Sequence, residues 1–507
     1  MNRPLALAVL SILAASSAAH AEDLLRVYED AVANDPLVRE ADANRRANRE
    51  TRPQALSALL PQFNGTAGYQ RSDTDTSGLA SQQDVTTGEI LVYDTSGETK
   101  PKTKTWNLEL RQNVFSWANW MALRRSSIEV AQAEADYLVA EQDLAVRVSQ
   151  RYFDVLAARD TLDAEQSALE AISRQLDQAD KRFEVGLIAI TDVQEAKSAR
   201  DNAAAAVIAA KRSLATSEEL LREITGRKYD SLRKPGSSIP LKSPEPADEA
   251  KWVELSLNQN LALISSRLSA DVARANVREA FAGHFPTVDA VGSRSYQDVD
   301  SQRTFDPIPP RPTTATGPNS SESYDTTYGF QLNVPLFSGG LTSSRTRQSQ
   351  YRWIAAKERV VRSSRETERA ARDSYLGVIS EIARVNALRQ ALESSQTALR
   401  ATEAGYEVGT RTAVDVLVAR RSLVAAQSDY ARSRYDYVLN VVSLRQAAGN
   451  LDRSTLAEIN AWLDESAPTS SRATSVEQAA QPEPNPPPPP GSDLPTAPQP
   501  TPRPPQQ

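Results

Sequence analysis

The sequence predicts a mainly α-helical protein that is built twice on one plan and whose strands belong to a transmembrane β-barrel. Three observations support this fold class. One motif occurs twice at an offset of 223 residues, two very long stretches lack proline and nearly all glycine, and short segments alternate between apolar and polar side chains. Long runs of good helix formers are typical of helices, and alternation with a period of two is typical of strands.

The repeated motif reads RFEVGLIAITDV at Arg182–Val193 and GYEVGTRTAVDV at Gly405–Val416. Glu-Val-Gly and Asp-Val stand at the same spacing in both copies. Flanking residue pairs recur at nearly the same offset as the motif, since Phe115-Ser116 recurs as Phe337-Ser338. Only two copies occur, so the sequence indicates an internal duplication and not a solenoid.

The N-terminus has the pattern of a secretory signal peptide. Arg3 precedes an apolar run from Leu5 to Ala15, and Ala19-His20-Ala21 supplies small residues for cleavage. We therefore expect residues 1–21 to be a Sec-type signal peptide that is cleaved after Ala21. No later stretch reaches the roughly 18 to 20 apolar residues of a spanning helix, so a helical membrane protein is not expected.

Composition excludes several classes of function. The formal net charge is −7, which argues against non-specific binding of nucleic acid. The chain has no cysteine and only two histidines, one of them inside the signal peptide, so disulfides, thiolate catalysis and Cys/His zinc sites are excluded. We expect the remaining His284 to be structural and expect no cofactor, no metal and no enzymatic activity, because no carboxylate has a recognisable catalytic partner.

Strands are expected at about residues 62–72, 104–115, 285–298 and 324–337. Apolar side chains alternate with polar ones in each segment, and aromatic residues lie toward the ends, as in the interfacial girdles of outer-membrane barrels. A soluble β-sandwich shares this pattern and remains an alternative. The inserts Ser72–Thr105 and Val299–Ser323 are rich in Ser, Thr, Gly, Asp and Pro, and we expect them to be long surface loops.

Two very long helices are expected. Asn119–Asp180 contains neither proline nor glycine, and Ser343–Gly405 is interrupted only by Gly377. At 1.5 Å per residue, the first would reach on the order of 90 Å, which is too long for an ordinary globular core.

The helix that follows Gly409 carries two apolar seams with coiled-coil spacing. The first seam holds Val414, Leu417, Val424, Ala431, Tyr435, Val438 and Val442, and the second holds Val416, Leu423, Tyr430, Tyr437, Val441 and Leu444. A helix with two seams has two neighbours, as in a ring of helices that encloses a tube, although an antiparallel bundle remains an alternative. Four strands cannot span a membrane as an open sheet, so a barrel would need several chains.

The chain resembles a known family through several long motifs. RQLDQADKRFEVGLIAITDVQEAKSARD, FPTVDAV, QLNVPLFSGG and EAGYEVGTRTAVDVLVA are closely similar to TolC-type outer-membrane efflux and secretion channels. The resemblance runs from Leu24 to about Asn460. It fails only in the two inserts and in the C-terminal tail.

The resemblance implies a homotrimer in the outer membrane of a Gram-negative bacterium. Its 12-stranded β-barrel would continue into a periplasmic α-barrel of 12 helices, surrounded by a mixed α/β equatorial belt. The implied division of the chain is a first structural repeat (22–226, helical hairpin 118–226), an equatorial segment (227–260), a second repeat (261–449, helical hairpin 339–449) and a second equatorial segment (450–465).

The implied function is that of a passive exit duct for multidrug efflux and type I protein secretion. The implied partners are a periplasmic adaptor (membrane fusion) protein, an inner-membrane transporter of RND or ABC type, and outer-membrane lipid; nucleic acid is not expected. The alternative is a periplasmic structural or adaptor coiled coil without a pore.

The Glu-Val-Gly turns would close the two helical hairpins. Gly186 and Gly409 allow the backbone conformation that ends one helix and admits the next. By the resemblance, all these turns gather at the periplasmic entrance of the tube.

The resemblance also implies a gate at this entrance. Asp192 would accept a hydrogen bond from Tyr406, and Thr191 would accept one from Arg411. Asp415 matches an acidic position that projects into the pore, whereas Val418 stands where the family's pattern has a second aspartate. Capping of the helix N-termini is the alternative role of Asp192 and Asp415, and both roles are compatible.

The tail, residues 466–507, holds 14 of the 30 prolines, including the run Pro486–Pro490. Such a composition cannot build a packed core, so we expect a disordered extension with local polyproline II structure. A segment that binds an aromatic groove of a partner remains an alternative.

Overall fold

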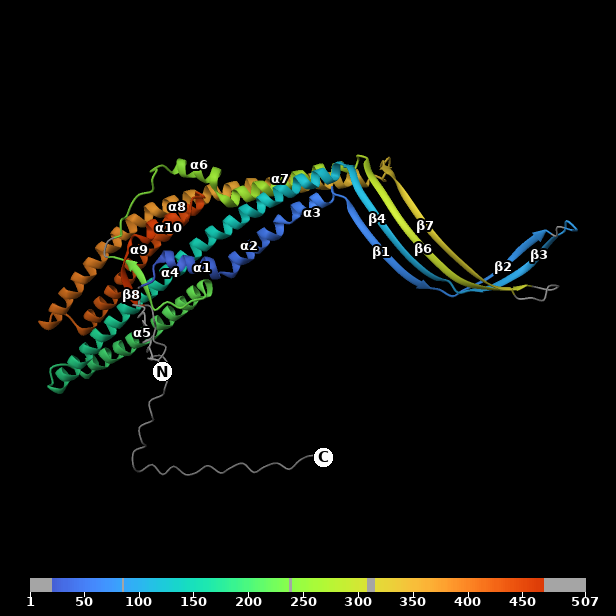
Figure 1. Ribbon diagram of the computed structural model, residues 1–507. Helices are drawn as coiled ribbons and strands as arrows, with labels where there is room; N and C mark the ends of the chain where they lie inside the picture. The colour runs from blue at the N-terminus through green and yellow to red at the C-terminus, as the bar shows by residue number, and fades with distance from the viewer. Residues whose placement is uncertain (1–20, 84–85, 237–238, 308–314, 469–507) are drawn as a thin grey trace, which may run out of the picture.

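The protein is an elongated molecule with a helical half and a long curved sheet (Figure 1). The computed structural model describes residues 21–83, 86–236, 239–307 and 315–468. Most of the predicted signal peptide and most of the Pro-rich tail lie outside these ranges. The expectation of a mainly helical chain is confirmed.

Two helical hairpins make up the helical half. Each consists of one very long helix and a shorter returning helix: α4 (Trp117–Glu184), α5 (Ile190–Thr225), α8 (Leu341–Glu407) and α9 (Ala413–Ala447). The long members have 68 and 67 residues, which corresponds to about 100 Å each. Ser116 caps the start of α4, because its hydroxyl accepts a hydrogen bond from the Asn119 N–H at 3.3 Å. Gly226 ends α5 in the left-handed conformation, with φ 70°.

The returning helix α9 lies between two neighbours, as its two apolar seams predict. It packs against α8 of its own hairpin and against α4 of the other hairpin. Tyr435 of α9 stacks on Phe153 of α4 at 5.6 Å between ring centroids. On the other side, Gly377 of α8 leaves room for Asn440 of α9, whose side chain would collide with a Cβ at this position. The prediction of two neighbours is confirmed.

Shorter helices complete the helical wall. They are α1 (Leu24–Asn34), α2 (Pro36–Arg49), α3 (Thr51–Ser57) and α7 (Leu261–Ala282). Helices α2 and α3 pack along α4, and α7 packs between α4 and α8. In the half nearer the sheet, four helical runs therefore lie side by side: α2 with α3, then α4, α7 and α8 (Figure 1).

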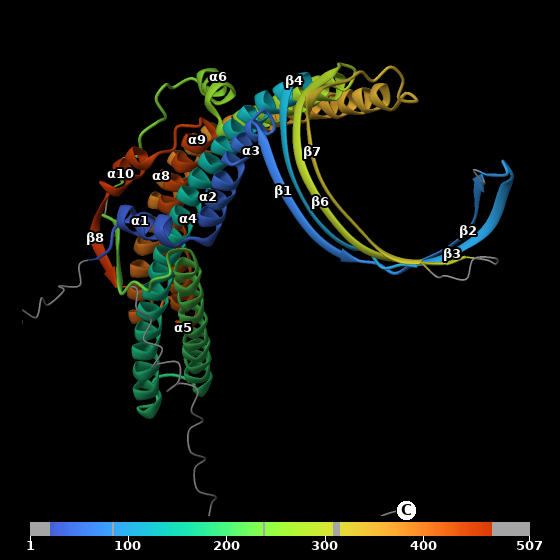
Figure 2. The ribbon, with the colours of Figure 1, turned by 45° about the vertical axis from the view of Figure 1, so that its right-hand side comes forward.

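The sheet is antiparallel and strongly curved (Figure 2). Its main strands run in the order β1 (Gln62–Arg71), β4 (Lys102–Ser116), β6 (Thr287–Pro307) and β7 (Ala315–Asn333). The hairpin of β2 (Thr74–Gln83) and β3 (Ile90–Thr99) extends it, because β3 pairs with the far end of β6. Among the described residues, β1 pairs only with β4, and β7 pairs only with β6.

The inserts between the strands differ from the expected loops. The stretch Ser72–Thr105 contains β2 and β3, and Val299–Ser323 contains the far ends of β6 and β7. Their Ser, Thr, Gly and Asp residues are typical of loops in single segments. However, antiparallel pairing satisfies the backbone groups of both strands whatever the side chains are, so two adjacent polar segments can form a hairpin.

An equatorial belt crosses the middle of the helices. It contains β5 (Ser231–Pro235) paired with β8 (Leu463–Pro468), and the helices α6 (Glu249–Gln259) and α10 (Arg453–Asn460). Strand β8 includes residues 466–468, which were expected to belong to the disordered tail; this expectation is wrong for these three residues, because pairing with β5 orders their backbone.

The main apolar core lies where the belt meets α4 and α9. Tyr152 of α4 is fully buried there, and its hydroxyl donates to the backbone oxygen of Arg233 in β5 at 2.5 Å. Tyr435 donates to the Asp160 carboxylate at 2.6 Å. Burial raises the pKa of both the Tyr435 hydroxyl and the Asp160 carboxyl. The Tyr152 bond therefore fixes the belt to the first hairpin, and the Tyr435 bond joins the two hairpins to each other.

Candidate functional site

Both hairpin tips use the same backbone turn. In the first tip, Gly186 N–H donates to the Phe183 oxygen at 2.8 Å and Leu187 N–H donates to the Arg182 oxygen at 2.9 Å. In the second, Gly409 N–H donates to the Tyr406 oxygen and Thr410 N–H donates to the Gly405 oxygen, at 3.1 and 2.8 Å. These pairs form the Schellman motif of a helix C-terminus.

The left-handed conformation explains the two glycines of the repeat. Gly186 has φ 75° and Gly409 has φ 80°. A Cβ would meet no other atom within 4 Å at either position, so the constraint comes from the backbone angle and not from crowding.

The second tip continues into α9 through a capping box. The Asp415 N–H donates to the Thr412 hydroxyl oxygen at 3.2 Å, and the Thr412 N–H donates to the Asp415 carboxylate at 2.9 Å. The backbone N–H of Thr412, and then its hydroxyl, hold the pKa of Asp415 below its usual 3.8. The capping role expected as an alternative for Asp415 is therefore observed.

The first tip is closed differently. The residue before α5 is Ala189, which has no side-chain group to cap the helix. Instead, Ile188 packs on a buried apolar cluster of Ala179, Val193 and Ala196. Asp192 lies in the first turn of α5 without making a cap hydrogen bond. Capping is therefore not observed for Asp192.

The predicted gate residues all lie at the tips of the two hairpins. Thr191 and Arg411 are exposed, whereas Asp192 and Tyr406 are half-buried. Within the described part of this single chain, no hydrogen bond joins Asp192 to Tyr406 or Thr191 to Arg411. Both links are predicted between neighbouring coils, and they stay predictions.

Two contacts at the tips were not predicted. The Arg182 guanidinium of the first tip lies 5.2 Å from the centre of the Tyr406 ring in the second tip. Arg411 folds over Gly405, where a Cβ would come within 2.8 Å of the arginine Cγ. The first contact depends on how the two hairpins pack, the second forms within the turn of the second tip, and no spacing in the sequence signals either of them.

A cavity of about 670 Å³, the tip cavity, lies between α4 and the second hairpin just behind these contacts. Its lining includes the basic residues Arg174, Lys181, Arg182 and Arg420. Arg420 is hydrogen-bonded to Glu403, which joins α9 to α8. The side-chain amide of Gln175 is buried there and has no partner among the described residues. Because Glu403 and Glu407 are the only acidic residues of this lining, the tip cavity places a net positive charge directly behind the turns.

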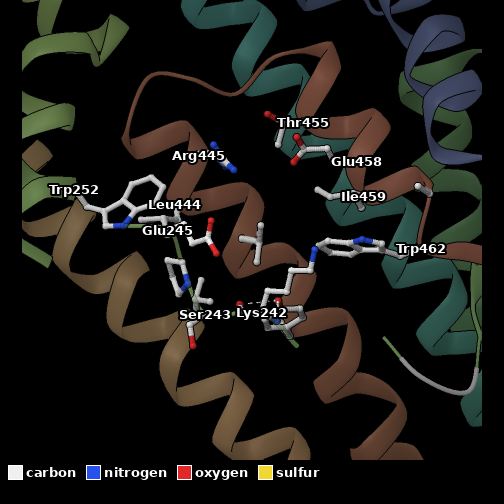
Figure 3. A pocket seen from close by; sticks show the side chains of 15 residues that line it. Lys242, Ser243, Glu245, Trp252, Leu444, Arg445, Thr455, Glu458, Ile459 and Trp462 are labelled. Atoms are coloured by element: carbon white, nitrogen blue, oxygen red, sulfur yellow. Dashed lines mark hydrogen bonds between the residues drawn. The ribbon is translucent and has the colours of Figure 1, made fainter. Parts of the chain in front are cut away.

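A second concave site lies on the belt (Figure 3). It has a volume of about 510 Å³ and is lined by aromatic rings and by charges of both signs, such as Arg445 and Glu458. Trp252 Nε1 donates to the Pro246 oxygen at 2.8 Å, and Tyr437 stacks on Trp462 at 6.5 Å. The described residues include no cluster of three or more His, Cys, Asp or Glu side chains that could hold a metal ion.

The sheet has one apolar and one polar face. Leu110 of β4 pairs with Phe63 of β1 and with Gly292 of β6, and Gly292 pairs with Tyr328 of β7. Directly paired side chains lie on the same face. That face is apolar and open, with Phe63, Leu108, Leu110, Tyr328, Phe330 and Leu332 among its exposed residues.

The opposite face carries hydrogen-bonded polar groups. Arg111 forms an ion pair with Asp289 at 2.7 Å, and the Asn113 amide donates to the same carboxylate at 2.9 Å. No helix among the described residues has the length and apolar character needed to cross a membrane.

Known proteins share both the sequence and the fold. The family model described as "Outer membrane efflux protein" matches the chain twice, over residues 27–227 and 252–450. The outer membrane protein TolC of Vibrio cholerae is 35% identical over 448 residues, which cover 88% of this chain and 95% of that protein. The alkaline protease secretion protein AprF of Pseudomonas aeruginosa is 27% identical over 441 residues, covering 86% of each.

A solved structure agrees with the architecture. The outer membrane protein VceC of Vibrio cholerae matches with a TM-score of 0.64 at 20% identity, over 85% of this chain and 97% of that one. Duplicated helical hairpins that continue into an antiparallel sheet thus define a TolC-like architecture. With two matches of the family model, one in each half, this chain belongs to the outer membrane efflux protein family. The membership indicates export and not catalysis.

Proposed function

We propose that this chain forms a homotrimeric outer-membrane channel, a passive exit duct for tripartite multidrug efflux and type I protein secretion. An inner-membrane transporter of RND or ABC type would supply the energy, and a periplasmic adaptor would join the two. AprF and the proteases secretion protein PrtF of Dickeya chrysanthemi, both relatives of this chain, support the secretion role.

The observation that carries the proposal is the sheet with one apolar face and two open edges. The exposed fractions of Tyr328 and Phe330 are 86% and 78%, and with their apolar neighbours on this face they form a contiguous exposed patch of the kind that marks an interaction or membrane surface. Lipid would cover this face. The open edges of β1 and β7 need partners inside a membrane, because no water is available there to satisfy their backbone groups.

A trimer meets both requirements. Pairing β7 of each chain with β1 of the next closes three four-stranded sheets into a 12-stranded barrel, with the polar face toward the lumen. The four helical runs of each chain then close a 12-helix tube below it. Helices of about 100 Å are long enough to carry this tube deep into the periplasm.

The hairpin tips would form the periplasmic gate. Tyr406 and Asp192 are both half-buried at adjacent tips. The Asp192 carboxylate makes no capping hydrogen bond that it would lose on bonding to Tyr406. We assign one link to Tyr406 and Asp192 and a second to Arg411 and Thr191, between neighbouring coils. The adaptor and the transporter would open the gate by breaking these links.

Asp415 would supply an acidic ring of three carboxylates at the pore entrance. Its hydrogen bonds to Thr412 keep the carboxylate ionised, because they lower its pKa. Val418, one turn further along α9, is exposed and adds no charge. A single ring concentrates less negative potential than two rings do, so the entrance would select cations only weakly.

The closing of the barrel is tested by crosslinking, for which the chain offers a background free of cysteine. The test uses a double variant with Thr66→Cys in β1 and Thr327→Cys in β7. Outer-membrane preparations of this variant would be treated with bis-maleimides of graded length. We expect covalent trimers. The matched control is Asn107→Cys with Ser295→Cys, two residues paired within one chain, which would be crosslinked internally and give no covalent dimer or trimer.

A monomer in the soluble periplasmic extract, with no crosslinked species at any reagent length, would favour the alternative of a coiled coil without a pore. Export itself would be measured in a deletion strain as sensitivity to dyes and detergents, and complementation by the full chain would restore resistance.

A further inference from the structure

A cleft lies where the sheet joins the helices, and the proposed function does not use it. This junction cleft has a volume of about 770 Å³ and is enclosed by the start of α4, the end of α7 and the start of α8. Its lining includes four aromatic side chains, Phe115, Trp117, Phe281 and Phe285, and two arginines, Arg124 and Arg278.

The aromatic side of the cleft continues the apolar face of the sheet. A bulge after Asn113 brings Phe115 opposite Val288, which lies on the same face as Gly292 and pairs with Leu332 of β7. From there, aromatic contacts lead into the helices, since Phe285 lies 6.2 Å from Trp117 and 5.8 Å from Phe281 between ring centroids. The exposed fractions of these three rings are 40–50%.

The two arginines lie at the end of the cleft farther from the sheet, since Arg124 follows Trp117 on α4 and Arg278 precedes Phe281 on α7. Both are exposed, and neither makes a hydrogen bond or an ion pair within the described part of the chain. The nearest acidic residues in sequence are engaged elsewhere, because Glu129 and Glu279 both pair with Arg125, at 3.4 and 3.3 Å. The cleft therefore offers two free guanidinium groups beside an apolar wall.

The spacing of these groups fits a bilayer interface. Arg124 stands seven residues after Trp117 on α4, which places it about 10 Å further along the helix axis. Aromatic rings favour the boundary of the hydrocarbon layer, and charged groups favour the headgroup layer just beyond it. Guanidinium groups bind phosphate through paired hydrogen bonds.

We propose that the junction cleft binds an anionic phospholipid of the periplasmic leaflet. Its phosphate lies between Arg124 and Arg278, and its acyl chains follow Phe115 onto the apolar face of the sheet. This inference rests on the proposed function for the orientation of the sheet in the outer membrane. It adds a specific lipid site at the base of the barrel.

The first test measures which lipid the purified full chain retains. Delipidated protein in detergent would be titrated with phosphatidylglycerol or phosphatidylcholine, and bound lipid would be counted by native mass spectrometry. We expect a preference for phosphatidylglycerol. In the double variant Arg124→Gln/Arg278→Gln, we expect this binding to fall on the order of tenfold, because two charge-assisted hydrogen-bonding groups are lost.

The matched control is Arg365→Gln. This arginine is also exposed on α8, but it lies about 22 Å beyond Gln350, the last cleft residue on that helix. It should leave lipid binding unchanged. Equal retention of phosphatidylglycerol by the wild type and the double variant, or displacement of the lipid by millimolar inorganic phosphate, would overturn the proposal.

A second test locates the lipid. Phosphatidylglycerol brominated in its acyl chains should quench the fluorescence of Trp117, and the quenched component should be absent in Trp117→Phe. Crosslinked trimers and channel conductance, measured on the same preparations, separate the two proposals. Trimers that conduct but show no arginine-dependent lipid binding would contradict the lipid site alone. Protein that neither trimerises nor conducts would contradict the proposed channel.

Discussion

The two hairpin tips share one sequence plan and one turn, yet different interactions hold their returning helices. Ile188 and Val193 close the first tip through apolar packing, and α5 begins without a side-chain cap. Thr412 and Asp415 close the second through a capping box. The duplication has therefore kept the backbone geometry and changed the chemistry that stabilises it.

This difference separates two aspartates that are equivalent in the repeat. Asp415 already accepts hydrogen bonds within its own tip, and Asp192 accepts none from its helix terminus. A carboxylate without internal partners can bond to a neighbouring coil at no cost to its own hairpin. In the proposed channel, the first tip would thus supply the acceptor for the gate, and the second tip would supply the fixed charge of the entrance.

The largest effect that would test this division is on conductance. Asp192→Ala should raise the single-channel conductance several-fold, because the gate loses an acceptor, while hydrogen exchange at the first tip stays unchanged. Asp415→Asn should leave conductance nearly unchanged and reduce cation selectivity. Planar bilayer recordings of both variants check this. Equal conductance in wild type and Asp192→Ala would remove Asp192 from the gate.

A second acidic ring can be added at the second tip. Val418 is exposed one helical turn beyond Asp415. In a trimer, Val418→Asp would raise the number of entrance carboxylates from three to six, so trivalent cations should block the channel at markedly lower concentration. The control is Val418→Asn, which is polar and neutral. Tight block of the wild type, equal to that of Val418→Asp, would contradict the single ring.

The shared turn should respond equally in both tips. Gly186→Ala and Gly409→Ala each place a Cβ on a left-handed residue, which costs about 1–2 kcal/mol of local stability. Space for the added methyl group is available in both cases. Hydrogen-exchange mass spectrometry of the tip peptides measures the free energy of local opening. A loss at only one glycine would show that the turns are not equivalent.

The sequence predicts the parts of this fold that local pattern controls. The helical hairpins follow from long runs of helix formers, and the positions of Gly186 and Gly409 follow from the conformational demand of a helix end. Alternation likewise identifies the segments that form β1 and β4. Periodicity also predicts the two neighbours of α9, because each apolar seam must be covered.

The sequence does not predict those parts of the structure that depend on pairing between separate segments. The polar inserts form β2 and β3 because each offers a partner to the other, and no single segment shows this. At the site, the repeat locates the tip residues but not their partners. Arg182 meets the Tyr406 ring only because the two hairpins pack together, and Asp192 differs from Asp415 because Ala189 replaces a capping threonine.

Substitutions of the residues that precede α9 and α5 should have a smaller effect on local stability, and the effect should have opposite signs at the two tips. Thr412→Ala removes the acceptor for the Asp415 N–H and should destabilise the second tip by about 1 kcal/mol. Ala189→Ser places a hydroxyl at the extended residue before α5, with ψ 154°, and should stabilise the first tip by no more than about 1 kcal/mol. Hydrogen exchange in the first turns of α9 and α5 checks both. Ala189→Gly, which adds no acceptor, is the control for the first tip.

The smallest effect is the response of the second tip to acid. Because hydrogen bonds lower the pKa of Asp415 in the folded state, its contribution to stability is fully present above the unfolded value of 3.8 and is lost as the pH falls through the lower folded value. Protection of the first turn of α9, corrected for intrinsic exchange rates, should therefore begin to fall only as the pH drops below about 3.8, and should keep falling at lower pH. Asp415→Asn should abolish this pH dependence, since the amide does not titrate. The first tip has no carboxylate in its cap, so an equal fall at α5 would mean that acid loosens the whole assembly and that the capping box is not the cause.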